Sequence, residues 1–123
     1  MKTGLAFVLA LLFVPMSLRA QDQPSYCTVE ARQEWYTIKL NQLPTWGTGS
    51  IESAYKLRLY MIQKGRCELD PEMPVCSISV KHGQFILNQG RNVVGKYPKL
   101  EEAGELFQQL VGAEFCQAPI TES

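Results

Sequence analysis

The sequence has little of what catalysis by a known mechanism usually requires. His82 is the only histidine in the 123 residues, and it precedes Gly83 at an expected turn. A general base there would need a nucleophile and an orienting group, and the sequence identifies neither. No HExxH, GxSxG or phosphate-loop pattern is present. We therefore expect a non-enzymatic protein with no catalytic residue and no cofactor.

Charge of one sign is also scarce. The chain has 12 Lys and Arg against 12 Asp and Glu, and two of the cations, Lys2 and Arg19, lie in the first twenty residues. Nucleic acids and anionic membranes are recognised through dense Lys and Arg patches. Neither is expected as the partner.

A long apolar run occurs only at the N-terminus. Lys2, the apolar residues 5–16 and the small Ala20 are together typical of a cleavable secretory signal. The run is shorter than the ~20 residues that span a bilayer. We expect cleavage after Ala20, which leaves residues 21–123 as one periplasmic or secreted domain without membrane insertion.

All four cysteines, Cys27, Cys67, Cys76 and Cys116, fall in this exported part. An even number of cysteines in an oxidising compartment predicts two disulfides. The alternative is a zinc site of four thiolates. The cysteines are 40, 9 and 40 residues apart, whereas structural zinc favours close pairs. We therefore expect no metal.

A shift of 49 residues superimposes the two halves of the chain. It places Cys27 on Cys76 and Cys67 on Cys116. Apolar positions also coincide: Val29 and Ile78, Tyr36 and Phe85, Ile38 and Leu87, Ile51 and Leu100, Ala54 and Ala103, Leu57 and Leu106, Met61 and Leu110. We infer an internal duplication with repeat one at residues 27–67, a linker at 68–75 and repeat two at 76–116. The triplet LNQ recurs 47 residues apart instead, which allows a slip inside the repeat.

Each repeat reads as strand, strand, helix. CTVEAR and CSISVK alternate apolar and polar residues, and EWYTIKL and QFILN alternate in the opposite phase, so turns are expected at residues 33–34 and 82–83. Ser50 is a suitable N-cap for the first helix, and Pro98 is tolerated in a first helical turn. An alternative takes NQGR, residues 88–91, as a hairpin turn and NVVGKY as a returning strand.

The expected fold class is α+β. Because neither repeat can bury a sheet face and a helix stripe alone, we expect one four-stranded sheet with both helices on one face, a permuted ferredoxin-like order. This arrangement favours the disulfides Cys27–Cys116 and Cys67–Cys76 over pairing within each repeat, Cys27–Cys67 and Cys76–Cys116. The longer bridge would then contribute about 4 kcal/mol and cost more on removal than the shorter one.

Five residues are candidates for partner binding. Trp35 is expected on the polar face of the sheet, where the alternative is a solvated face with one tolerated ring. Trp46 lies in a Pro- and Gly-containing segment, residues 42–50, and could contact a ligand or tuck against the core. Tyr55, Leu59 and Tyr60 widen the apolar face of the first helix. They predict a partner or homodimer contact, with packing under the terminal segments as the alternative.

The segments SIESAYKLRLYMIQKG and KLEEAGELFQQLVG resemble the helical halves of the repeats in SPOR domains. That resemblance implies a twofold strand and helix architecture and binding to peptidoglycan glycans in the bacterial envelope. It is one of architecture, and no site residue is carried over. Our expectation is an exported recognition module for a protein partner, in the manner of an inhibitor or neutralising protein. An envelope glycan-binding module is the alternative, and an unrecognised small hydrolase comes third.

Overall fold

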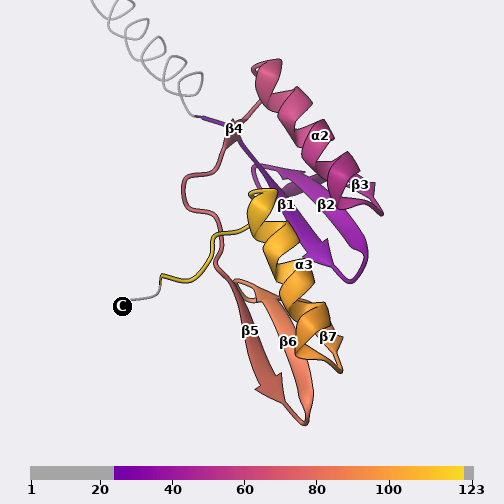
Figure 1. Ribbon diagram of the computed structural model, residues 1–123. Helices are drawn as coiled ribbons and strands as arrows, with labels where there is room; N and C mark the ends of the chain where they lie inside the picture. Colours follow the sequence, from indigo (N-terminus) through magenta and orange to yellow (C-terminus); the bar gives the residue numbers. More distant parts are fainter. Residues whose placement is uncertain (1–23, 121–123) are drawn as a thin grey trace, which may run out of the picture.

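The computed structural model describes residues 24–120, so the expected signal peptide, residues 1–20, lies outside the described residues. Seven strands and two helices form an α+β structure with two sheets and two disulfides (Figure 1). The first half contains β1 (Tyr26–Arg32), β2 (Trp35–Leu40), β3 (Leu43–Thr48), α2 (Ile51–Gln63) and β4 (Glu68–Leu69). The second half contains β5 (Cys76–Lys81), β6 (Gln84–Gln89), β7 (Asn92–Tyr97) and α3 (Leu100–Gly112).

The elements of the two halves recur at a constant spacing. β2 and β6, β3 and β7, and α2 and α3 each begin 49 residues apart. Single backbone hydrogen bonds recur in the same way: Asn41 N–H donates to the Tyr26 carbonyl, and Gly90 N–H donates to the Val75 carbonyl. The identical LNQ triplets therefore do not mark a slip inside the repeat.

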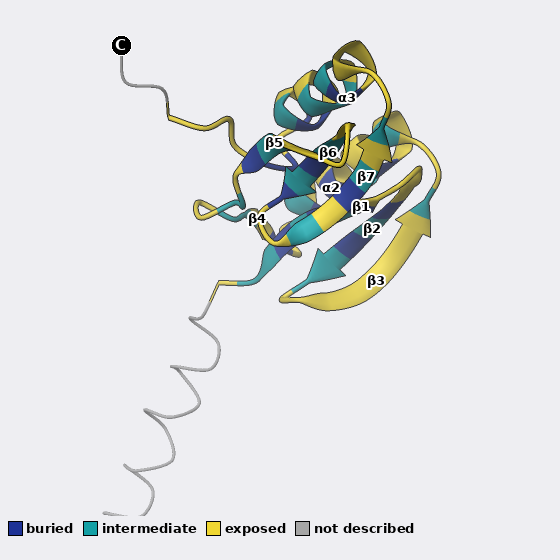
Figure 2. Ribbon diagram, turned by 90° about the horizontal axis from the view of Figure 1, so that it is seen from below, coloured by how far each residue is buried: buried dark blue, intermediate teal, exposed yellow. Residues whose placement is uncertain are grey.

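Each half has a third strand that the favoured strand, strand, helix prediction lacks. The alternative with NVVGKY as a returning strand is confirmed, since this segment is β7. Its counterpart β3, LPTWGT, contains Pro44 and Gly47, has no apolar alternation and is an almost wholly exposed edge strand (Figure 2). Proline and glycine are rare inside strands, which is why this segment reads as a loop.

Tight two-residue turns connect these strands. Gln33 and His82 occupy equivalent turn positions with φ of 58° and 54°, and Gly83 follows with φ of 74°. Few side chains adopt this left-handed conformation, but histidine is among those enriched in it. The left-handed conformation of this turn position is thus a sufficient structural explanation for a histidine at residue 82.

The expectation of one four-stranded sheet is wrong. The strands form two sheets, in the orders β3-β2-β1-β4 and β5-β6-β7. With its third strand, each antiparallel meander is wide enough to cover its own helix: α2 packs on β1 to β3, and α3 packs on β5 to β7. Both helices lie on the same side of the sheets (Figure 1).

The favoured disulfide pairing, Cys27–Cys116 and Cys67–Cys76, is also wrong. The structure contains Cys27–Cys67 and Cys76–Cys116, both 40 residues apart. After three antiparallel strands, the chain is at the end of the sheet opposite to the start of the first strand. The following helix therefore runs back toward the start of that strand. Each helix therefore ends beside the first cysteine of its own half. With only two strands before it, each helix would have ended at the opposite end of the sheet, away from that cysteine.

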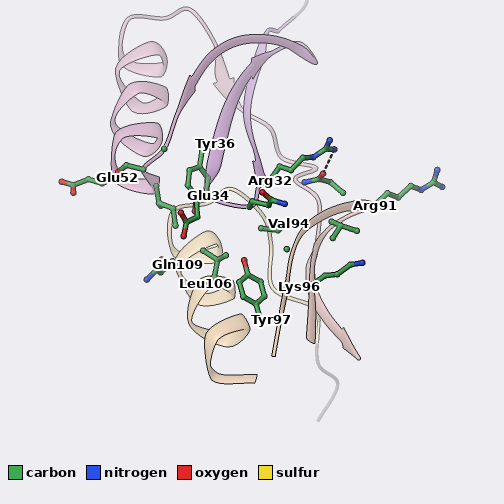
Figure 3. Close-up of a pocket in the computed structure, with 17 residues that line it drawn as sticks. Arg32, Glu34, Tyr36, Glu52, Arg91, Val94, Lys96, Tyr97, Leu106 and Gln109 are labelled. Carbon is green, nitrogen blue, oxygen red and sulfur yellow. Dashed lines mark hydrogen bonds between the residues drawn. The ribbon is translucent and has the colours of Figure 1, made fainter. Parts of the chain in front are cut away.

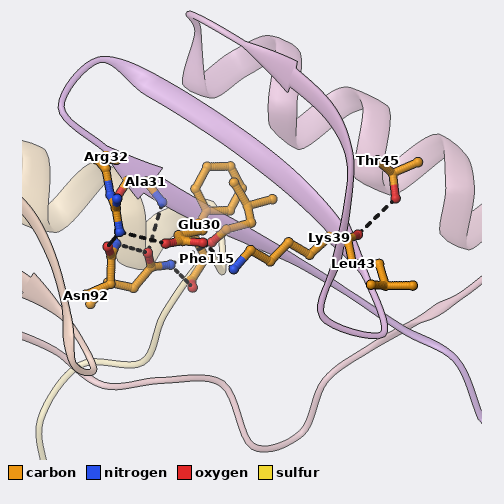
Figure 4. A network of polar contacts seen from close by, with 10 residues as sticks. Glu30, Ala31, Arg32, Lys39, Leu43, Thr45, Asn92 and Phe115 are labelled. Carbon is orange, nitrogen blue, oxygen red and sulfur yellow. Dashed lines mark hydrogen bonds and ion pairs between the residues drawn. The ribbon is translucent and has the colours of Figure 1, made fainter.

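Side-chain amides join the two halves where β1 runs beside β7 (Figures 2 and 4). The buried Gln89 accepts from Ala31 N–H at 2.9 Å and donates to the Val29 carbonyl at 2.6 Å and the Phe115 carbonyl at 2.9 Å. Asn92 donates to the Ala31 carbonyl at 2.7 Å. These amides supply the hydrogen bonds that a neighbouring strand would otherwise provide to β1.

A single core cluster lies between the helices and the sheets. The apolar residues of the alternating segments CTVEAR, CSISVK, EWYTIKL and QFILN that face the helices are mostly buried, with Val29, Ala31, Ile38 and Leu87 essentially inaccessible. Val80 is the exception. It lies near the end of the edge strand β5 and is 67% exposed.

Candidate functional site

The two tryptophans do not form one site. Trp35 lies on the outer face of β2, where its indole covers Gly47: a Cβ built there would lie 2.6 Å from the ring. Trp46 pairs with Ile38, whose side chain faces the core, and cross-strand neighbours point to the same face of a sheet. The two rings, 53% and 58% exposed, therefore project from opposite faces.

The three partner-binding candidates of the first helix remain accessible on the surface of α2. We call Tyr55, Leu59 and Tyr60 the α2 face; their exposed fractions are 38%, 38% and 51%. The described terminal segments leave them accessible, in contrast to the alternative of packing under the chain ends. Tyr55 also borders a shallow hollow of about 400 Å³, shared with Gly112 and Ala113 at the end of α3.

A large concave feature of the structure involves residues that the sequence did not single out. An open groove of about 1420 Å³ lies where the two halves meet (Figure 3). Its walls are the β1–β2 turn, the start of α2, strand β7 and one side of α3. We call it the inter-repeat groove. Among the residues that line it are Glu34, Tyr36, Ile51, Val94, Tyr97 and Leu106.

Two phenol hydroxyls open into this groove. Tyr36 is only 5% exposed, and its hydroxyl makes no hydrogen bond to any described residue. No buried side-chain nitrogen or oxygen of the described chain lacks a partner, so this hydroxyl must be in contact with solvent. Tyr97 lies on the opposite wall with its ring folded over Gly95, where an added Cβ would lie 2.6 Å from the hydroxyl oxygen.

Glu34 lies close enough to both phenols of the groove to affect their ionisation. Burial raises the pKa of Tyr36, and the neighbouring Tyr97 and Glu34 raise it further. Burial likewise raises the pKa of Tyr97, with added contributions from Glu34 and Glu102. In Figure 3, Glu34 lies between the two tyrosines, whereas the side chains of Arg91 and Lys96 extend away from them.

Of the other charged groups that line the groove, Arg32 and Glu52 are paired, whereas Arg91 and Lys96 are in no ion pair between described residues. Arg32 donates to Asn92 at 3.0 Å and contacts Glu30 at 3.4 Å, and Glu52 pairs with Lys56 at 2.9 Å. No ion pair between described residues involves Glu34. Glu34 thus has no ion-pair partner in the described chain and lies between the two phenols (Figure 3).

The side chains that line the groove are carboxylates, phenols, cations, amides and apolar groups. All four cysteines are in disulfides, so the zinc alternative has no thiolate ligand. Within residues 24–120, no three His, Cys, Asp or Glu side chains are grouped to hold a metal ion. His82 lies at the β5–β6 turn and does not line the groove. Carboxylate and phenol groups around an apolar floor suit the binding of a polar or cationic group.

Comparisons with known proteins return no family model, no curated protein and no solved structure that matches this chain. The two disulfides suggest an oxidising, exported environment. No helix in the described part of the chain is long and apolar enough to cross a membrane.

The groove was missed because its residues come from distant segments. Tyr36 and Tyr97 lie 61 positions apart in the sequence, and the contact between β1 and β7 brings them to one place. Tyr36 lies on the buried face of β2, in keeping with the alternation of EWYTIKL. The accessibility of its hydroxyl depends on how the second half of the chain packs against the first.

Proposed function

We propose that this chain is an exported recognition module that binds a protein partner through the α2 face. One asymmetry between the repeats carries the proposal. Where α2 has Tyr55, Leu59 and Tyr60, α3 has Gly104, Gln108 and Gln109 at the equivalent positions. Both helices pack on their sheets in the same way, so the extra apolar groups of α2 are not needed for packing.

The rest of the structure supports this proposal. Tyrosine and leucine side chains on a rigid helix provide contact area at a low cost in conformational entropy. The disulfide Cys27–Cys67 holds the chain shortly after α2 to the start of β1, so this surface is preorganised. Such a surface suits an inhibitor or a neutralising protein, whose partner must be held firmly. The alternative to be tested is that a second copy of this chain binds the α2 face and forms a homodimer.

The test begins with affinity capture on the mature, oxidised chain from envelope and culture fractions. Binding of any captured protein is then measured with both components purified. We expect the triple variant Tyr55→Ala/Leu59→Ala/Tyr60→Ala to bind at least about tenfold more weakly, as is typical when central aromatic contacts are lost. The matched control is Gln108→Ala on α3, at the position equivalent to Leu59 and outside the groove lining. Equal affinity of the triple variant and the wild type would refute the proposal, and sedimentation of the chain alone tests the homodimer.

A specific observation favours a second candidate, an envelope glycan-binding module. The indole of Trp35 lies over Gly47 on the outer face of the sheet, beside Thr37 and Lys39 of the same strand. An exposed ring among hydrogen-bonding side chains suits stacking against a sugar. This candidate requires retention on peptidoglycan that Trp35→Ala abolishes and that Trp46→Ala, on the opposite face, leaves unchanged.

A further inference from the structure

Three polar groups without partners meet in the inter-repeat groove. They are the carboxylate of Glu34 and the hydroxyls of Tyr36 and Tyr97, from two strands of different sheets and the β1–β2 turn. Tyr36 is about 95% buried, and its hydroxyl has contact with solvent in the groove. A hydroxyl directed into a groove is thus available to a ligand.

The charge of the groove specifies the sign of that ligand. Glu30 and Glu52 pair with Lys39 and Lys56, whereas no ion pair between described residues involves Glu34. The lining cation Arg32 is bonded to Asn92 and Glu30. The lysine and arginine side chains at the rim, Lys96 and Arg91, extend away from the phenols (Figure 3). A positively charged group would therefore complement the interior.

The two aromatic rings indicate which kind of positively charged group suits the groove. A cation is attracted to the face of a phenol ring, and a phenol oxygen can accept a hydrogen bond from an ammonium or guanidinium group. Leu106 and Val94 add apolar surface to the groove, against which the methylene stem of such a side chain can pack. Lysine and arginine combine these two properties.

The backbone beside Glu34 is suited to an extended segment. Gln33 N–H donates to the Val94 carbonyl, after which the chain turns away from β7. β7 is the edge strand of its sheet, so the side of β7 away from β6 has no further strand of that sheet beside it. This short open edge borders the groove and can pair with one added strand.

We propose that the inter-repeat groove binds a lysine or arginine side chain presented by an extended segment of the partner protein. The cationic group lies against Glu34, between the hydroxyls of Tyr36 and Tyr97. This inference rests on the proposed function in one respect only, namely that the partner is a protein.

The test is a titration of the isotope-labelled, oxidised mature chain followed by amide chemical shifts. The probes are Nα-acetyl-arginine methylamide and Nα-acetyl-lysine methylamide, and the neutral comparison is Nα-acetyl-norleucine methylamide. We expect saturable shifts at the amides of Glu34, Gly95 and Lys96 with the two basic probes and none with the neutral one. Glu34→Gln should weaken binding at least about fivefold, because it removes a charge-assisted hydrogen bond. Tyr36→Phe, which keeps the ring, should weaken it by a smaller factor.

The matched control is Glu105→Gln, the same change of charge at an exposed position of α3 outside the groove lining. The proposal is overturned by absent or unsaturable shifts in the groove, by an equal response to norleucine, or by a Glu34→Gln variant that binds as the wild type does. The α2 triple variant separates the two proposals. It should retain binding of the basic probes while losing the protein partner, so either can fail alone.

Discussion

The guanidinium of Arg58, on α2, lies 5.1 Å from the centre of the Phe115 ring in the other repeat. The same group donates to the Ala113 carbonyl at 2.7 Å and to the Glu114 carbonyl at 2.8 Å. Arg58 is only 3% exposed, and burial lowers its pKa, although the nearby Glu114 opposes that shift. A buried cation is thereby stabilised by the carbonyl groups at the end of α3.

Arg58→Met should therefore destabilise the protein through the contact between its helices. It removes two charge-assisted hydrogen bonds and leaves two carbonyls without donors, at a cost of about 2–4 kcal/mol in the free energy of unfolding. Urea denaturation measures this, with Arg66→Met, at an exposed position after α2, as the control. A loss no larger than that of the control would show that the bonds to α3 contribute little.

Gln89→Leu should weaken the junction between β1 and β7. The change places in repeat two the residue that repeat one has at the equivalent position, Leu40, so the side chain suits the strand itself. It nevertheless removes the hydrogen bonds to Val29, Ala31 and Phe115. We expect a loss of about 2–4 kcal/mol from the unsatisfied buried groups. Gln84→Leu, at an exposed position on the same strand, should stay within about 0.5 kcal/mol of the wild type.

Removal of either disulfide should destabilise the fold to a similar extent. Both bridges close loops of 40 residues, for which the chain-entropy model predicts about 4 kcal/mol each. The variants are Cys27→Ala/Cys67→Ala and Cys76→Ala/Cys116→Ala, compared by urea denaturation. Non-reducing peptide mapping of the wild type should recover these two pairs; recovery of a peptide joining Cys67 to Cys76 would contradict the connectivity.

Tyr36 should make the protein sensitive to alkaline pH. Its folded-state pKa is raised above the ordinary 10.0, chiefly by burial, so the folded protein holds this proton more tightly than the unfolded chain does. The resulting stability is fully present below about pH 10 and is lost as the pH rises through the folded-state pKa. Stability measured against pH should fall less steeply in Tyr36→Phe than in the wild type. Tyr60→Phe, on the α2 face, is the control and should follow the wild type.

Local patterns in the sequence predicted much of the secondary structure. The helix after Ser50 begins at Ile51, and the Ser50 hydroxyl accepts from Ser53 N–H at 3.2 Å, as an N-cap does. The turns at residues 33–34 and 82–83 are confirmed, as is the burial of Val29 and Ile38. Each of these depends on residues close together in the chain.

The third strand of each repeat could not be predicted with equal certainty. Pairing with β2 and β6 makes LPTWGT and NVVGKY into strands, and a short edge strand needs no apolar alternation. The wrong sheet count and the wrong disulfide pairing both followed from this single omission. One strand more or fewer reverses the direction in which the following helix runs.

The sequence by itself determined the α+β class, the 49-residue repeat, the start of the first helix after Ser50 and the presence of four cysteines suited to two disulfides, because these depend on periodicity and spacing along one chain. Only the tertiary structure decided which cysteines meet, how the two sheets adjoin and that Glu34, Tyr36 and Tyr97 share a groove. These outcomes depend on the docking of β1 against β7. That docking is set by the side-chain amides of Gln89 and Asn92, whose partners are about sixty residues away.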